Sequence, residues 1–218
     1  MSKKLNQEVD TNIESLSKAE TFITKNNKKI LTVVGIVLAA VIAFLCVRGC
    51  NDKKAAEAAE ALTVIENNAL MSTDSLSNAI VLADLENYLS EYGSNSVKAA
   101  SFEAGVAAFQ AKDYSKAINY FSEYETEDAI FAARALACIA DCYVELGDYE
   151  KAYENYTAAV AKADNEFASE YAFRAGLVAE KLGMKDKALN MYKVVKDNYP
   201  ASPRAGEIEK YISRVEAK

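Results

Sequence analysis

The 218-residue sequence contains no histidine, no tryptophan, only two prolines, eight glycines and four cysteines. Without histidine the chain lacks the commonest general base and the commonest metal ligand. Four cysteines are too few to form the disulfide framework of a small secreted domain. Scarce proline and glycine leave long stretches without helix breakers, and apolar residues make up 51% of the chain. These features predict an all-α protein that can bury a real core.

Sets of catalytic residues are also missing from the sequence. It contains no glycine-rich phosphate loop and no serine or cysteine that could pair with a histidine. The acids Glu125, Glu127 and Asp128 precede a predicted helix, where carboxylates stabilise a helix N-terminus. We therefore expect no enzymatic activity, no cofactor, no metal and no small-molecule substrate.

Charge is unevenly distributed along the chain. Residues 1–47 hold six lysines and four acids, whereas residues 48–218 hold 19 basic and 28 acidic residues, a balance of −9. Such an acidic region would repel a phosphate backbone, so nucleic acid is not an expected partner.

The longest apolar run predicts a transmembrane helix. Ile30–Val47 carries no charge over 18 positions, which is enough to cross the hydrocarbon layer. Residues 1–29 form a tail in which Thr11 and Glu14 match a capping box, so a short amphipathic helix is one interpretation and a loose polar tail the other.

Two processing alternatives bear on this segment. The tail is too long for a typical secretory signal, and Arg48 follows the apolar run, so cleavage is not expected. A lipoprotein signal ending at Cys50 is the second alternative, which Gly49 fits and Arg48 does not. Cys50 could otherwise form an intermolecular disulfide in an oxidising compartment.

Lysines next to the apolar run predict its orientation. Lys25, Lys28 and Lys29 precede it, while Arg48 and the pair at 53–54 follow it. The bias places the N-terminus in the cytoplasm. In a Gram-negative bacterium the chain would then be a single-pass inner-membrane protein with a periplasmic domain.

The sequence after residue 95 repeats with a period of 35 to 36 residues. The corresponding positions are small residues at Gly105, Ala140 and Gly176, alanines at Ala117, Ala152 and Ala188, and aromatic residues at Phe121, Tyr156 and Tyr192. This pattern resembles the tetratricopeptide repeat, although the signature tryptophan is absent and only the third repeat keeps a late proline, Pro200.

The resemblance implies a right-handed α-solenoid of two-helix hairpins, with repeats at about 96–128, 129–164 and 165–201. Gly147 and Gly183 would end first helices with positive φ. The small residues would lie where helices cross closely, and the aromatic residues would fill the space between hairpins.

Regions outside the three repeats predict further helices. Residues 48–94 are interpreted as a linker helix and a degenerate first hairpin, formed by 53–71 and about 82–92. Ser202 and Pro203 give a helix start signal, so residues 202–218 are predicted to form a C-terminal capping helix.

In tetratricopeptide arrays the first helix of each hairpin lines a concave face, where partners usually bind. The candidate residues on this face are Phe102, Val106, Phe109, Arg134, Asp141, Glu145, Phe173, Arg174 and Lys181. The alternative for Phe102, Val106 and Phe109 is that the preceding hairpin covers them. Cys138 and Cys142 share a helix face; they are either half of a metal site or, as we favour, buried small residues.

The layout of short tail, single span and repeat domain resembles the ancillary subunit of the bacterial SecYEG translocon. This resemblance implies a membrane-anchored interaction scaffold in envelope protein export, folding or assembly, with the translocon or periplasmic chaperones as partners. Two alternatives stay open. One is a lipoprotein similar to the helical-repeat subunit of the barrel-assembly machine, and the other is a membrane adaptor that faces the cytoplasm.

Overall fold

The computed structural model describes residues 2–70, 75–93, 96–163 and 165–217. Before residue 78, side chains are described at residues 25, 26, 32 and 36–70. The chain consists of two compact units, Met1–Lys53 and Lys54–Lys218.

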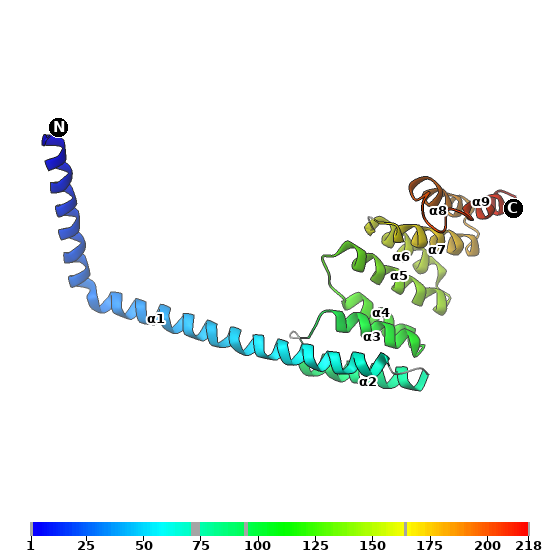
Figure 1. Cartoon of the computed structure of the whole chain (residues 1–218), viewed down its shortest axis with the longest axis horizontal. Coiled ribbons are helices and arrows are strands. Elements are labelled where there is room, and N and C mark those ends of the chain that lie inside the picture. Colours follow the sequence, from blue (N-terminus) through cyan, green and yellow to red (C-terminus); the bar gives the residue numbers. More distant parts are fainter. Residues whose placement is uncertain (1, 71–74, 94–95, 164, 218) are drawn as a thin grey trace. The chain divides into compact units, whose positions relative to one another are not determined.

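The described residues form nine helices and no strands, so the predicted all-α class is confirmed (Figure 1). The helices are α1 (Ser2–Leu70), α2 (Ser75–Tyr92), α3 (Ala99–Gln110), α4 (Tyr114–Glu123), α5 (Ala129–Leu146), α6 (Tyr149–Lys162), α7 (Phe167–Lys181), α8 (Lys185–Asn198) and α9 (Ile208–Glu216).

The first unit consists of the N-terminal part of α1. Over the residues that are described, no helix offers an apolar window long enough to cross a membrane. The predicted span Ile30–Val47 is covered only in part, because the side chains of residues 30, 31 and 33–35 lie outside the described set. The capping-box residues Thr11 and Glu14 of the predicted tail helix also lie outside it.

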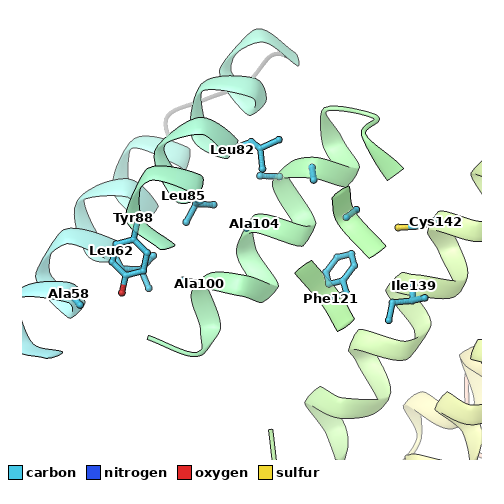
Figure 2. Close-up of a cluster of buried hydrophobic side chains, with 13 residues drawn as sticks. Ala58, Leu62, Leu82, Leu85, Tyr88, Ala100, Ala104, Phe121, Ile139 and Cys142 are labelled. Carbon is cyan, nitrogen blue, oxygen red and sulfur yellow. The ribbon is translucent and has the colours of Figure 1, made fainter. Parts of the chain in front are cut away.

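The second unit begins with the last part of α1, which packs with α2. Ala58 and Leu62 of α1 share a buried cluster with Leu82, Leu85 and Tyr88 of α2. Figure 2 shows Leu82 and Leu85 on the side of α2 toward α3, whose alanines 100 and 104 belong to the same cluster. The small alanine side chains let the three helices approach closely.

α2 is longer than the sequence suggested. It begins at Ser75 and not near residue 82, although Gly93 follows its end with a φ of 49°. The polar stretch before Val81 contains no proline or glycine. Burial of Leu82 and Leu85 therefore stabilises a helix that continues upstream through weak helix formers.

Three hairpins follow, α3–α4, α5–α6 and α7–α8, and each helix contacts the next along the chain. In the outer two, a glycine lies against an aromatic ring of the second helix. A Cβ placed on Gly105 would lie 2.7 Å from Phe121 Cδ1, and one on Gly176 would lie 2.7 Å from Tyr192 Cδ1. In the middle hairpin Ala140 shares a cluster with Tyr156. The second-helix alanines at these contacts are all buried: Ala117, Ala152 and Ala188.

The turns inside the hairpins follow a common pattern. Gly147 and Gly183 have φ values of 80° and 70°, as predicted. The corresponding residue of the first repeat is Lys112, which has a φ of 64° despite its side chain. Asp113 directly follows Lys112 and Asp148 directly follows Gly147, and each carboxylate accepts a hydrogen bond from the backbone N–H three residues later, at 3.2 Å. These caps satisfy donors at the start of the second helix.

The C-terminal helix is shorter than predicted. Residues 200–207 form turns, and α9 begins at Ile208 and not directly after Ser202. Gly206 lies where the first helical turn would be, and glycine disfavours helix by about 1 kcal/mol. Ile208, Ile212 and Val215 are buried against α7 and α8, so α9 covers the end of the array.

Candidate protein-binding groove

We call the first helices of successive hairpins the first-helix face: residues 54–70 of α1 together with α3, α5 and α7. At its N-terminal end, α1, α2 and α3 enclose a hollow of about 820 Å³, here called the first-hairpin groove. Its apolar walls are formed by Ile65 and Leu70 of α1, Val81 and Leu85 of α2, and Phe102 and Val106 of α3. Such an apolar hollow suits side chains of a bound polypeptide.

Two of the three apolar candidates on α3 line this groove. Phe102 is held edge-on against Phe121 and Tyr124, with ring centroids 5.2 and 5.3 Å away, so its orientation is fixed by its own hairpin. Val106 lies one turn further along α3 and also faces the groove. Phe109 instead packs on Tyr114 of α4, at 5.4 Å. The preceding hairpin thus covers Phe102 and Val106 only partly.

Among the residues that the structure describes, the charged ones that line the groove are Glu66 of α1 and Glu103 of α3. Burial, and then the negative charge of Glu66, raise the pKa of Glu103 to about 7 from an ordinary value of 4.5. Sequence analysis missed this pair, although the two acids are separated by close to one repeat length. That spacing was the available signal.

Two of the predicted charged residues, Asp141 of α5 and Arg174 of α7, bind one another. The Arg174 guanidinium donates to both carboxylate oxygens of Asp141, at 2.8 and 2.9 Å, and to Glu170 at 2.8 Å. Tyr156 of α6 also donates to Asp141. Burial alone would raise the pKa of Glu170, but hydrogen bonds from Arg204 and Arg174 lower it overall. These contacts tie neighbouring hairpins together.

At the C-terminal end of the face, Phe173 belongs to the core and not to a surface. It is buried, its ring meets that of Tyr211 edge-on at 4.8 Å, and the Arg204 guanidinium covers it at 4.3 Å. Arg204 also donates to Glu170 at 2.6 and 3.2 Å. The prediction of Phe173 as a contact residue is therefore corrected, because the segment before α9 folds over it.

The remaining charged candidates are more exposed, and each has a contact within the chain. Arg134 lies over the ring of Phe102 at 5.5 Å, and Lys181 lies over Tyr149 at 5.5 Å. Glu145 accepts a hydrogen bond from the Tyr114 hydroxyl at 3.3 Å. These single, exposed contacts are weak enough for a partner to replace them.

The two helix cysteines are inert thiols. Burial raises the pKa of Cys138 to about 11 and that of Cys142 to about 12, so both stay protonated at neutral pH. In the part of the chain that the structure describes, no three histidine, cysteine or acidic side chains are placed to hold a metal ion.

Stacked two-helix hairpins with small residues at their crossings define a helical-repeat protein. The tetratricopeptide repeat family model matches residues 82–130 and 139–203, which is more than half of the chain. The chain therefore belongs to the tetratricopeptide repeat family.

Other comparisons add little. The crystal structure of MamA is similar to this chain at 15% identity and a TM-score of 0.49. The matched region covers 65% of this chain and 88% of the MamA chain. No curated protein matches the sequence.

Proposed function

We propose that this chain is a membrane-anchored scaffold that binds a protein partner in the first-hairpin groove. The observation that carries the proposal is the contrast along the first-helix face. Its C-terminal half is occupied by pairs such as Arg174–Asp141, whereas its N-terminal end has an apolar hollow of about 820 Å³. Tetratricopeptide repeats are in general non-catalytic scaffolds for other proteins, which agrees with this function.

Membrane anchoring is the second part of the proposal. The large apolar side chains between Ile36 and Val47 are exposed, with Ile36 at 65% and Phe44 at 64%. A continuous exposed apolar stretch of this kind is typical of a surface that contacts a membrane or another protein. Together with the uncharged run that begins at Ile30, it supports lipid as the cover.

The lysines before this run support an N-terminus in the cytoplasm and a repeat domain outside it. We propose a role in bacterial envelope protein export, folding or assembly, with translocon subunits or periplasmic chaperones as partners. A reporter that is active only outside the cytoplasm, fused to Lys218, tests the orientation. An inactive reporter would contradict this role and favour the alternative, a membrane adaptor that faces the cytoplasm.

The lipoprotein alternative is tested on the same cells. Mass spectrometry of the N-terminus should find the intact tail. An acylated Cys50 would instead identify a lipoprotein and remove the transmembrane anchor from the proposal.

Crosslinking inside cells tests the groove itself. A photoreactive residue at Gln110, which is exposed at the groove rim, should form adducts with envelope or exported proteins. The matched control is the same residue at Lys193, exposed on α8. Equal adducts at both positions, or none at Gln110, would contradict binding in the groove.

A further inference from the structure

The first-hairpin groove combines apolar walls with a pair of acids from two different helices. Glu66 projects from α1 and Glu103 from α3, and within the described part of the chain no basic residue lines the hollow with them. α2 contributes the uncharged Asn78 to the lining. From α5, the Arg134 guanidinium lies over the ring of Phe102 at 5.5 Å. The described lining of the groove thus holds no counter-ion for the two carboxylates.

This arrangement selects for one kind of occupant. An entirely apolar segment would bury the acids further without pairing them, which is unfavourable. An acidic segment would add a third negative charge. A segment with one cationic side chain between apolar ones would pair the acids and cover the walls formed by Phe102, Val106 and Leu70.

We propose that the first-hairpin groove binds a polypeptide segment that inserts one lysine or arginine side chain between Glu66 and Glu103 while its apolar neighbours pack on the groove walls. This inference rests on the proposed function and specifies the chemistry of the partner. It also assigns Glu66 and Glu103 as the residues that determine specificity.

The inference includes a dependence on pH. With the groove empty, the pKa of Glu103 is about 7, because of burial and the charge of Glu66. A bound cation stabilises the ionised carboxylate, so binding releases a proton near neutral pH. If the bound state keeps Glu103 fully ionised, affinity rises about tenfold between pH 6 and pH 8.

The test uses the full chain in lipid nanodiscs and two labelled probes. One probe is an amphipathic peptide of leucine and alanine with a single central lysine. In the other, norleucine replaces that lysine, which removes the charge but keeps the apolar stem. Fluorescence anisotropy is measured at pH 6, 7 and 8, with empty nanodiscs giving the contribution of lipid.

We expect the lysine probe to bind about tenfold more tightly at pH 8 than at pH 6, and the norleucine probe to bind weakly at every pH. Glu103→Gln should weaken the lysine probe by about tenfold at pH 8 and abolish the pH dependence. Glu66→Gln should lower the pH midpoint, because the second cause of the raised pKa is lost. Glu60→Gln is the control, since it removes an equally negative, exposed residue of α1 that does not line the groove.

Three results would overturn the inference. Equal binding of the norleucine probe would mean that the groove accepts apolar segments without a cation, while the scaffold function would stand. A pH dependence that persists in Glu103→Gln would place the titrating group elsewhere. Self-association of the chain that excludes the lysine probe from the groove would make a second copy the occupant. If the probes fail and Gln110 also gives no adducts in cells, the proposed function fails as well.

Discussion

Replacing Gly176 by alanine tests whether close helix crossing explains the small residues of the repeats. The new Cβ would lie 2.7 Å from Cδ1 of Tyr192 and even nearer to Cε1. Tyr192 is fully buried, and its hydroxyl donates to Glu180 at 2.7 Å. The rings of Phe173 and Tyr211 flank it, with centroids 6.1 and 5.7 Å away. The tyrosine ring therefore has little freedom to move aside.

The expected size of the effect comes from two opposing contributions. Overpacking a close-packed core costs about 1–3 kcal/mol. Alanine in place of glycine inside a helix returns up to about 1 kcal/mol. We therefore expect Gly176→Ala to lower the local free energy of unfolding of α7 and α8 by about 1–2 kcal/mol.

Hydrogen exchange followed by mass spectrometry suits this measurement, because stability in a repeat array varies along the chain. Amides of α7 and α8 should exchange about tenfold faster in the variant, and those of α3 should not change. The same substitution is then made in a Tyr192→Leu background, where it should stabilise α7 because the ring is gone. A Gly176→Ala protein that is as stable as the parent, or an equal loss in both backgrounds, would refute the steric explanation.

Three further substitutions test other features. Lys112→Gly should stabilise the α3–α4 hairpin by about 0.5–1 kcal/mol, because glycine adopts a φ of 64° without strain. Hydrogen exchange measures the change, and the control Lys112→Ala should give no gain in stability. The raised pKa of Glu103 means that the parent protein loses stability as the pH rises from about 4.5 through about 7. After allowance for screening this loss is about 1 kcal/mol, and Glu103→Gln should remove it. The comparison is made on urea unfolding midpoints at pH 5 and pH 8. Arg204→Ala should lower the free energy that holds the segment before α9 over Phe173 by about 1–2 kcal/mol, and proteolysis of that segment should become faster. Arg204→Lys should not restore protection, because an ammonium group cannot match the two-point contact of the guanidinium with Glu170.

The helices and the repeat family could be predicted because the pattern of small and aromatic residues recurs at a fixed period. A single hairpin cannot bury its apolar face, so this periodicity carries information about stacking as well as local structure. The starts of α2 and α9 could not be predicted in the same way. At Ser75, burial of residues further along the helix overrides weak local propensity, and near Ser202 a good start signal fails because Gly206 follows.

The site was less accessible to sequence reasoning because its chemistry depends on contacts between hairpins. Phe102 and Val106 stood out as apolar residues on one helix face, and they line the groove. Whether Arg174 is available to a partner depends on Asp141, which lies on the preceding first helix. No feature of the sequence around Glu103 distinguishes it from exposed acids. Its raised pKa arises from its burial in the fold and from the nearby charge of Glu66.

These contacts also determine where along the first-helix face a partner can bind at least cost. A ligand that competed for Arg174 would have to break its charge-assisted hydrogen bonds to Asp141 and Glu170, each worth about 1.5–3 kcal/mol. In the groove between α1, α2 and α3 a cationic ligand replaces one hydrogen bond, that between Glu66 and Glu103, and it pairs the negative charge that these two acids carry. The ion pairs of the C-terminal half of the face therefore stabilise the array itself, whereas the N-terminal end would gain stability from the partner that we propose. This difference in local electrostatics, more than the apolar area, favours the first-hairpin groove over the rest of the face.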